Sequence, residues 1–550
     1  MTRSGSHVDY PHSRRRRSHG RAIVSTVVAL AVTAGIGYWG YSSLVAEEGP
    51  DDPEVAKATA HLKKFLDAWQ RADARRAALL TDSPDNAESL IKSVMANLDP
   101  SKTEINAGDA EKKAEGEVEV RFSVGMSLPG AGRYEWDSKA DVVKADNKWN
   151  VKFHTEVIHP EMVPGQTLAL KTRDRAPILD RNGEDLESAS LVGTVDARTG
   201  KGVSGLQARY DKQLTGGSGP VKSVVVVDRR SGQVVKKLTG PGASQGKPVR
   251  TTIDPEVQKA AADALSAVEK NAAIVALDPS TGHILAAANR PAGMNRALEG
   301  RYPPGSTFKV VTAAALLKRG MKPSDPGECP KFAHAGGQRF ENQDQFLLPP
   351  GSTFRDDFAH SCNTFFVNAR DKLSASALHD TAAAFGIGGT WDVGTTTYDG
   401  SVPVTTSDND KAAATIGQAR VQASPLVMAS VAATAKEGVF RQPVLVPGAV
   451  KKKYEAPARL DAGVFEGLRG MMRATVTEGA GRALRGIPGE PHAKTGTAEF
   501  GTENPPRTHA WMIGYQGDRD LAWSVLLEDG GSGGADAGPI AAAFLQNLVG

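Results

Sequence analysis

The sequence predicts a multidomain α+β protein whose largest unit is an antiparallel sheet flanked by helices. In residues 52–160, apolar residues first recur at helical spacing and then alternate as in strands, which is typical of a small α+β domain. From about residue 251, strand-like hairpins stand near both ends of the remaining chain, with helical segments between them. We therefore expect strands from both ends of this unit to pair in one sheet. The 550 residues are enough for several such units.

Composition and net charge are typical of a globular protein and do not indicate a nucleic-acid-binding one. With 40% hydrophobic and 23% charged residues, the chain is ordinary for a globular protein. Its net charge of +3 gives no reason to expect nucleic-acid binding. Arginines are concentrated in residues 1–21, which contain Arg14–Arg17 and a single acid, Asp9. We predict a basic cytoplasmic tail there.

Residues 22–41 form an uncharged apolar run, close to the roughly 20 residues that a helix needs to cross a bilayer. Aromatic residues at its end and acidic residues after it favour a single-pass anchor in the cell membrane, with the N-terminus cytoplasmic and the bulk of the chain outside. A cleaved signal peptide is the alternative. Cleavage after Ala46 would place Leu44 where a small residue is preferred, so we favour the uncleaved anchor.

The elements expected along the chain follow from these periodicities. Residues 161–250 are less regular, and in them we interpret Arg175, Asp180 and Arg181 as a structural salt-bridge network. The expected helices cover residues 53–80, 252–265 and 540–549. The expected strands include residues 118–124, 149–153, 224–227, 273–277, 283–288, 510–515 and 521–527.

The first chemical motif is Ser306-x-x-Lys309, which follows a Pro-Pro-Gly turn and opens an apolar helical run. Residues three apart share a helix face, so the Lys309 amine can reach the Ser306 hydroxyl. A serine needs such an adjacent base to become a nucleophile. Two other matches to the same spacing begin at Ser89 and Ser244, but they stand in a polar helix and a glycine-rich loop.

The third motif along the chain is Lys494-Thr495-Gly496-Thr497, which occurs once and fits the edge of a strand. A lysine and two hydroxyls suit a carboxylate ligand, and the glycine lets that ligand approach the backbone. Taken alone, it is equally well explained as an exposed strand with a turn.

The second motif along the chain is Ser361-Cys362-Asn363, which we expect to begin a helix. A competing match, Ser407-Asp408-Asn409, lies in a stretch rich in turn-forming residues and is interpreted as a loop. Cys362 and Cys329 are the only cysteines, so a disulfide or two buried thiols both remain open. Neither a metal nor a cofactor is expected.

In chain order, Ser-x-x-Lys, Ser-x-Asn and Lys-Thr-Gly are the signature of serine penicillin-recognising enzymes. The chain resembles a class B, monofunctional penicillin-binding protein. The resemblance implies an NTF2-like domain in residues 52–160, a pedestal or dimerisation region in 161–250 and a penicillin-recognising transpeptidase domain in 251–550. It also implies peptidoglycan stem peptides and β-lactams as ligands, and a glycosyltransferase as a partner in a cell-wall complex.

The resemblance further implies a role for each motif residue. Ser306 would attack the donor D-Ala-D-Ala peptide, Lys309 would act as the base, and Ser361 would relay the proton. The catalytic group would be Ser306, Lys309, Ser361 and Lys494. The substrate-binding group would be Asn363, Thr495, Gly496 and Thr497, and the backbone N–H groups of Ser306 and Thr497 would form the oxyanion hole.

The same three motifs are compatible with other reactions, and the rest of the sequence favours or disfavours each of them. A class A β-lactamase needs a glutamate between the second and third motifs to activate water. The chain has no glutamate between Glu341 and Glu437, which disfavours that reaction. A D,D-carboxypeptidase and a non-enzymatic β-lactam-binding or divisome scaffold remain as alternatives to the transpeptidase.

Overall fold

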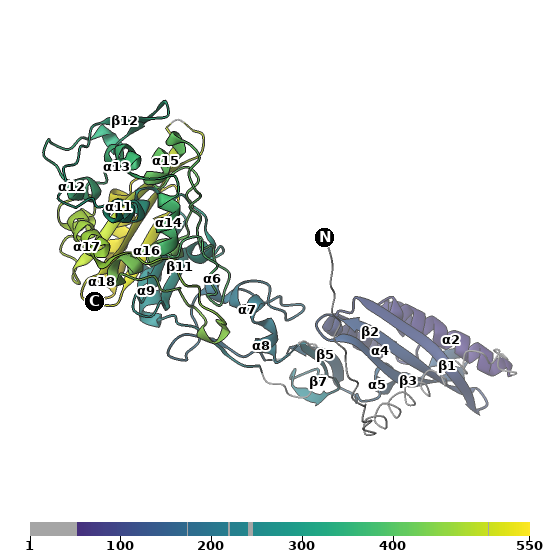
Figure 1. Ribbon diagram of the computed structural model, residues 1–550. Helices are drawn as coiled ribbons and strands as arrows, with labels where there is room; N and C mark the ends of the chain where they lie inside the picture. Colours follow the sequence, from purple (N-terminus) through teal and green to yellow (C-terminus); the bar gives the residue numbers. More distant parts are fainter. Residues whose placement is uncertain (1–51, 173, 218–220, 240–245, 504, 550) are drawn as a thin grey trace, which may run out of the picture. The chain divides into compact units, whose positions relative to one another are not determined.

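The computed structural model describes residues 52–172, 174–217, 221–239, 246–503 and 505–549 (Figure 1). The predicted basic tail and membrane anchor lie outside these residues. Across the described ranges, no helix is both long enough and apolar enough to cross a bilayer.

The chain separates into two compact units. The first contains the described residues up to Met126, together with Glu135–Thr167 and Asp228–Ser231. The second contains Ser127–Tyr134, Leu168–Val227 and the described residues from Gly232 onward.

The first unit combines helices with a four-stranded sheet of order β1-β2-β3-β4. Its elements are α2 (Pro53–Gln70), α3 (Ala74–Ala78), α4 (Pro84–Leu98), β1 (Lys102–Ala114), β2 (Glu117–Leu128), β3 (Gly132–Ala145), β4 (Lys148–Val151) and α5 (Thr155–Ile158). The apolar face of α2 is buried, and its Trp69 packs edge-on against Phe122 of β2 with ring centroids 6.4 Å apart. This arrangement agrees with the α+β prediction for this part of the chain.

The helical spacing of residues 53–80 is confirmed, and the structure has two helices there, α2 and α3. Ala72 takes a left-handed backbone with φ 58°, which ends α2. Asp73 then caps α3 by accepting a hydrogen bond from the Arg76 backbone N–H. Aspartate is among the preferred N-cap residues, so a new helix starts at this point.

The region between residues 161 and 250 has short elements. They are β5 (Gln166–Thr172), β6 (Ile178–Leu179), α6 (Ala189–Val192), α7 (Gly205–Arg209), α8 (Asp211–Thr215), β7 (Lys222–Asp228), β8 (Val234–Lys237) and β9 (Val249–Arg250). The proposed network of Arg175, Asp180 and Arg181 does not form. Arg175 pairs with Asp211 at 2.7 Å and Arg181 with Asp254 at 3.0 Å. Asp180 instead accepts backbone N–H groups in the following turn.

The second unit is built on a five-stranded antiparallel sheet of order β11-β10-β16-β15-β14. The strands are β10 (Ala272–Leu277), β11 (Ile284–Arg290), β14 (Pro491–Phe500), β15 (Arg507–Gln516) and β16 (Ala522–Leu527). The prediction of one sheet made from both ends of this unit is confirmed.

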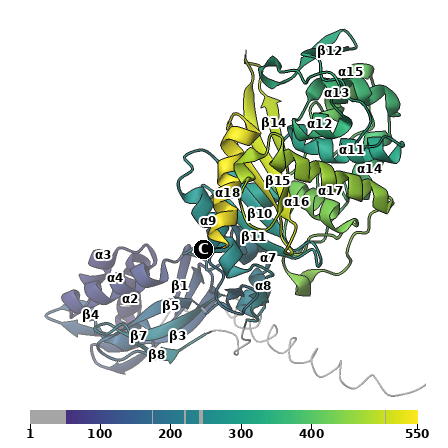
Figure 2. The same cartoon turned by 90° about the vertical axis from the view of Figure 1, so that its left-hand side faces the viewer.

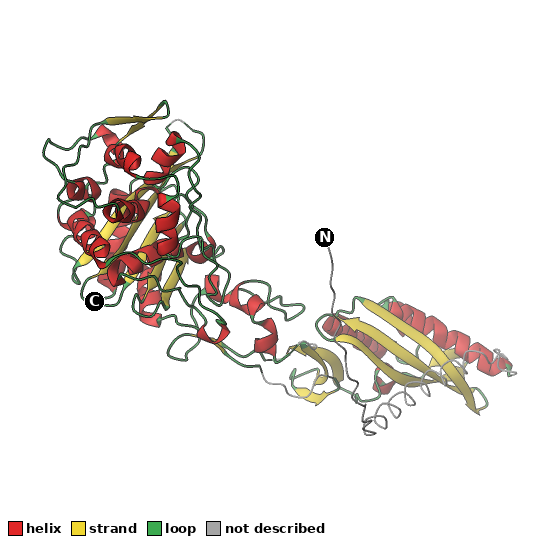
Figure 3. Ribbon diagram, in the orientation of Figure 1, coloured by secondary structure: helices red, strands yellow, loops and turns green. Residues whose placement is uncertain are grey.

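Helices cover both faces of this sheet (Figures 2 and 3). Alternate residues of β10 enter two different cores: Ile274 packs with α9 (Pro255–Ser266) and α18 (Gly538–Asn547), whereas Val275 packs with α11 (Lys309–Lys318) and α16 (Pro425–Glu437). A strand that is buried on both faces has a continuous run of apolar residues in the sequence, and Ala272–Leu277 is such a run.

Most of the remaining described elements lie between β11 and β14 in the sequence, and one follows β16. The helices are α10 (Arg296–Glu299), α12 (Phe354–Ala359), α13 (Asn363–Ala369), α14 (Ala377–Ala384), α15 (Asp408–Thr415) and α17 (Ala462–Thr477). The hairpin strands are β12 (Phe332–Ala335) and β13 (Gln338–Glu341), and the 3₁₀ helices are η1 (Gly305–Phe308), η2 (Gln343–Gln345), η3 (Arg370–Lys372), η4 (Pro447–Ala449) and η5 (Arg482–Leu484). A π-helical turn, η6 (Gly533–Ala537), leads into α18.

Candidate active site

Three segments that are far apart in the sequence meet at the β14 edge of the sheet. They are η1 with Ser306, the turn between α12 and α13 with Ser361, and β14 with Lys494. Ser306 was expected on a helix, but it lies in the 3₁₀ turn before α11, which begins at Lys309. Ser361 was expected to begin a helix, but it lies two residues before α13.

Lys309 links the first and second motifs. Its Nζ donates to the Ser361 carbonyl at 2.8 Å and to Asn363 Oδ1 at 2.7 Å, and it lies 3.4 Å from Ser361 Oγ. The Ser306 hydroxyl donates to the same Asn363 Oδ1 at 3.4 Å. In the described part of the chain no hydrogen bond joins Ser306 and Lys309 directly, so Asn363 connects them.

Lys494 joins the third motif to the second. Its Nζ donates to Ser361 Oγ at 2.8 Å and to the Thr495 carbonyl at 3.0 Å. Both Lys309 and Lys494 are completely buried. The two lysine amines therefore approach one hydroxyl oxygen, that of Ser361, from different elements.

Close packing of η1 against β14 explains two glycines. A Cβ on Gly496 would lie 2.9 Å from the Thr307 nitrogen and 3.0 Å from the Pro304 oxygen. A Cβ on Gly305 would lie 2.5 Å from the Thr497 carbonyl oxygen. Because the N–H and C=O of a strand residue point to the same side, the Thr497 N–H also faces η1.

Burial lowers the pKa of Lys309 well below its usual range, and the nearby charge of Lys494 lowers it further. Burial also lowers the pKa of Lys494, to about 7. The shift at Lys309 favours the neutral amine, which is the form that can accept a proton.

Asp357 is a further buried ionisable group near this site. Neither of its carboxyl oxygens has a hydrogen-bond partner among the described residues. Burial, and to a lesser extent the charge of Asp356, raises the pKa of Asp357 to about 7. Its carboxyl is therefore largely neutral in acid and does not form an ion pair with Lys309 there.

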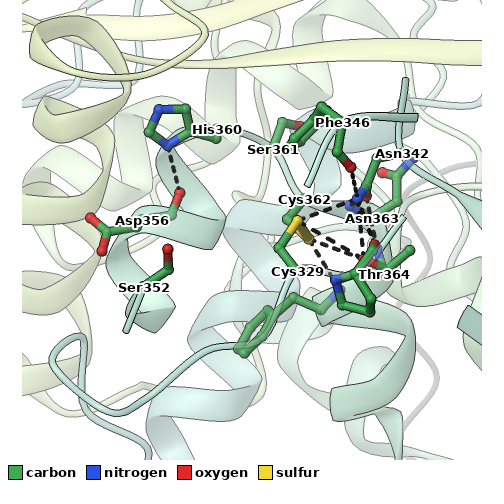
Figure 4. The surroundings of a disulfide bond; sticks show 12 residues. Cys329, Asn342, Phe346, Ser352, Asp356, His360, Ser361, Cys362, Asn363 and Thr364 are labelled. Carbon is green, nitrogen blue, oxygen red and sulfur yellow. Dashed lines mark hydrogen bonds between the residues drawn. A yellow bond between two sulfur atoms is a disulfide. The ribbon is translucent and has the colours of Figure 1, made fainter. Parts of the chain in front are cut away.

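Cys329 and Cys362 form a disulfide, which settles the choice that the sequence left open (Figure 4). The Asp357 carboxyl lies within 4.8 Å of both sulfur atoms, a grouping that could otherwise hold a metal. Because the two sulfurs are bonded to each other, they offer no thiolate ligand.

The sequence did not identify Asn342, Gln343 or Asp357 as residues of this region. Asn342 is buried and contacts the start of α13, and Gln343 Oε1 accepts a hydrogen bond from Thr497 Oγ1 at 3.4 Å. Asn342 and Gln343 stand in the polar stretch Glu-Asn-Gln-Asp-Gln, which reads as an ordinary surface loop. No local signal could have found them.

The competing motif matches lie elsewhere. Ser89 is in α4 of the first unit, where its Oγ accepts a hydrogen bond from Arg229. Ser244 is outside the described residues. Ser407, expected in a loop, is instead the N-cap of α15 and accepts from the Asp410 N–H.

Substituting the two candidate Ser-x-Asn serines separately distinguishes them. We expect Ser361→Ala to slow acylation by a fluorescent penicillin on the order of 10²-fold, because the hydroxyl between the two lysines is lost. Ser407→Ala removes only a helix cap, at a cost of about 1 kcal/mol in stability, and leaves the acylation rate unchanged. Equal rates for the two variants would reject the choice of Ser361.

An antiparallel sheet whose edge strand meets a buried serine and two buried lysines defines the class of penicillin-recognising serine enzymes. The chain belongs to the penicillin-binding protein transpeptidase family, since the family described as "Penicillin binding protein transpeptidase domain" matches residues 272–546. The family described as "NTF2-like N-terminal transpeptidase domain" matches residues 57–166. The predicted family and fold class are thereby confirmed.

Related proteins agree with this assignment. The chain is 33% identical over 367 residues to the peptidoglycan D,D-transpeptidase PbpA of Mycolicibacterium smegmatis, covering 55% of this chain and 72% of that protein. It is 32% identical over 371 residues to PbpA of Mycobacterium tuberculosis, with the same coverage. Among solved structures, the ceftriaxone acyl-enzyme complex of M. tuberculosis penicillin-binding protein A matches with a TM-score of 0.58 and 26% identity, covering 69% of this chain and 99% of that one.

Proposed function

We propose that this chain is a peptidoglycan D,D-transpeptidase that cross-links stem peptides through an acyl ester on Ser306. The observation that carries the proposal is the convergence of two buried lysine amines on Ser361 Oγ, beside the Ser306 hydroxyl. The names of the PbpA relatives support the same reaction.

Lys309 is proposed as the base that activates Ser306. A neutral lysine amine has two N–H donors and one lone pair. Its two shortest contacts, to the Ser361 carbonyl and Asn363 Oδ1, use both donors. The lone pair then remains to accept the Ser306 proton when the substrate is bound, since catalytic hydrogen bonds often tighten only in the complex.

Ser361 is proposed as the proton relay. When Ser306 Oγ bonds to the carbonyl carbon of the penultimate D-Ala, the peptide C–N bond breaks. The proton taken up by Lys309 passes through Ser361 Oγ to the departing D-Ala nitrogen. Ser361 suits this role because its hydroxyl lies between Lys309 Nζ, at 3.4 Å, and Lys494 Nζ, at 2.8 Å.

The substrate would lie along the edge of β14 that pairs with no other strand of the sheet. Asn363 would hydrogen-bond the donor backbone, and Lys494, Thr495, Gly496 and Thr497 would hold its terminal carboxylate. The backbone N–H groups of Ser306 and Thr497 would bind the oxyanion. The Thr497 N–H faces η1, and first-turn N–H groups such as that of Ser306 lack intrahelical partners.

In the second half-reaction, the amine of an acceptor stem peptide attacks the Ser306 ester, and Ser306 is released with its proton. We propose that β-lactams acylate the same serine. Solved ceftriaxone and penicillin G acyl-enzyme complexes of a penicillin-binding protein that is 25–26% identical to this chain support this proposal.

We further propose that residues 22–41 anchor the chain in the cell membrane as a single span, with residues 1–21 cytoplasmic and the catalytic domain outside. Residues 52–160, 161–250 and 251–550 would then be the NTF2-like domain, the pedestal and the transpeptidase domain. Because cross-linking consumes newly polymerised glycan, we propose that a glycosyltransferase works beside this protein.

Product analysis tests the function directly. The full-length chain is incubated in detergent with lipid-linked precursor and a glycan-polymerising enzyme, and the muropeptides are separated after digestion of the glycan. We expect cross-linked dimers that disappear when penicillin is added. Trimmed monomers alone would show a D,D-carboxypeptidase, and an unchanged substrate would show a non-enzymatic protein.

A further inference from the structure

The Ser361 backbone has a conformation that requires support from its surroundings. Its φ of 64° is in the left-handed region, which costs a non-glycine residue about 1–3 kcal/mol. Its N–H is bonded to the Phe358 carbonyl at 3.1 Å, and that of Cys362 to the Asp357 carbonyl at 2.8 Å. These two bonds hold the turn on the α12 side only.

The disulfide holds the same turn from the opposite side. Cys362, the middle residue of the motif, is bonded through sulfur to Cys329, which precedes the β12–β13 hairpin. Both cysteines are buried, and Cys362 is the N-cap of α13. The Cys362 sulfur accepts the Phe365 backbone N–H at 3.3 Å, so the disulfide also meets the first turn of that helix.

Asn342 provides a second connection between the hairpin segment and α13 (Figure 4). Its Oδ1 accepts the backbone N–H groups of Asn363, at 2.7 Å, and Thr364, at 3.1 Å. Its Nδ2 donates to the Pro330 carbonyl at 3.0 Å and the Phe346 carbonyl at 2.9 Å. One buried amide therefore joins both ends of the segment 329–346 to the start of α13.

The residue before Asn342 fixes the orientation of the Asn363 amide. Asn363 Nδ2 donates to the Glu341 carbonyl at 2.9 Å. With the nitrogen held there, Asn363 Oδ1 faces Lys309 Nζ and Ser306 Oγ. Displacing the segment would therefore misplace the acceptor that links Ser306 and Lys309.

We propose that the Cys329–Cys362 disulfide and the Asn342 amide act as one positioning device, which sets Ser361 and Asn363 at the distances that acylation of Ser306 requires. The inference rests on the proposed function, because acylation is the step that it affects. Breaking the disulfide lets the turn and the hairpin segment move apart. It also creates a Cys362 thiol that can turn toward the Asp357 carboxyl, which has no hydrogen-bond partner among the described residues.

Acylation by a fluorescent penicillin tests the device in the full-length chain, with wild type, Cys329→Ser, Asn342→Ala and the double variant. We expect each single variant to lower the limiting acylation rate constant about tenfold to a hundredfold. The concentration for half-saturation is expected to change less than the rate constant, because Asn363 is displaced but the carboxylate-binding residues of β14 are untouched. The double variant is expected to be no more than about twofold slower than the slower single variant, because the two changes disable one device.

A reversible form of the acylation experiment reduces the disulfide of the wild-type protein with a dithiol reductant. One dithiol supplies two electrons and two protons to the disulfide, gives two cysteine thiols and becomes a cyclic disulfide itself. Thiol alkylation and mass measurement verify the reduction, and reoxidation is expected to restore the rate. Thermal unfolding of each sample separates a loss of position from a loss of fold.

Asn409→Ala is the matched control, because Asn409 donates to Gln338 of the same hairpin at 2.7 Å and, in the part of the chain that the structure describes, makes no hydrogen bond to the Ser361 turn. Its acylation rate is expected to equal that of the wild type. A folded Cys329→Ser variant that is acylated at the wild-type rate overturns the proposal. So does a double variant whose loss in acylation rate equals the product of the losses in the two single variants. If wild-type Ser306 is not acylated at all, the proposed function fails instead.

Discussion

Replacing Ser306 with alanine is expected to abolish covalent labelling by a fluorescent penicillin, a loss of at least roughly 10³-fold in rate. The reason is that no other group in the site can form the ester at that position. Among the described residues the Ser306 side chain makes one hydrogen bond, a 3.4 Å contact to Asn363, so the variant is expected to fold normally. Gel fluorescence of the full-length chain measures the result.

The other two Ser-x-x-Lys matches are the controls for this experiment. Ser89→Ala and Ser244→Ala should be labelled as strongly as the wild type. Ser89 is in α4 of the first unit, and its hydroxyl contacts Arg229. Labelling that persists in Ser306→Ala would reject the assignment of the nucleophile.

Replacing Lys309 with methionine is expected to slow acylation by about 10²–10⁴-fold at every pH, because the general base is removed while the apolar volume is kept. In the wild type, the rate should fall in acid as Lys309 becomes protonated and regain its plateau as the amine becomes neutral. Burial and Lys494 lower the pKa of Lys309, so this fall occurs far below the range of an ordinary lysine.

The Lys494→Met variant tests the direction in which the charge of Lys494 shifts the pKa of Lys309. Without the neighbouring positive charge, the protonated form of Lys309 is more stable, so the pKa of Lys309 rises. The fall of the acylation rate in acid, the acid limb, therefore moves to higher pH. The measurement is the acylation rate as a function of pH for the wild type and both variants. A limb that moves to lower pH in Lys494→Met, or a Lys309→Met rate within tenfold of the wild type, would contradict this assignment.

The sheet and its edge strand could be predicted because their signals are local. The run Ala272–Leu277 is apolar throughout, as expected for a strand covered on both faces. The β14 sequence carries lysine, hydroxyls and a glycine where a ligand can approach the backbone. The periodicity of residues 53–80 does not locate the break at Ala72, because alanine is a strong helix former, although Asp73 is a capping residue.

The geometry around Ser361 could not be predicted for a different reason. Its left-handed backbone is imposed by contacts with distant residues, because nothing in Ser-Cys-Asn itself favours φ of 64°. Asn342 reaches Asn363 across 21 positions, and Cys329 reaches Cys362 across 33. Such pairings depend on how the hairpin segment folds back, which spacing along the chain does not encode.

The order of the strands in the sheet also affects how the protein is made. β10 is an interior strand, but its partner on one side, β16, comes last in the sequence among the described strands and is translated after them. At usual elongation rates the ribosome needs roughly tens of seconds to travel between them. Throughout that interval one edge of an apolar strand has no partner, which is a template for misassociation between nascent chains. The same arrangement means that a chain truncated before Ala522 would lack the strand that joins β15 and β14 to the rest of the sheet.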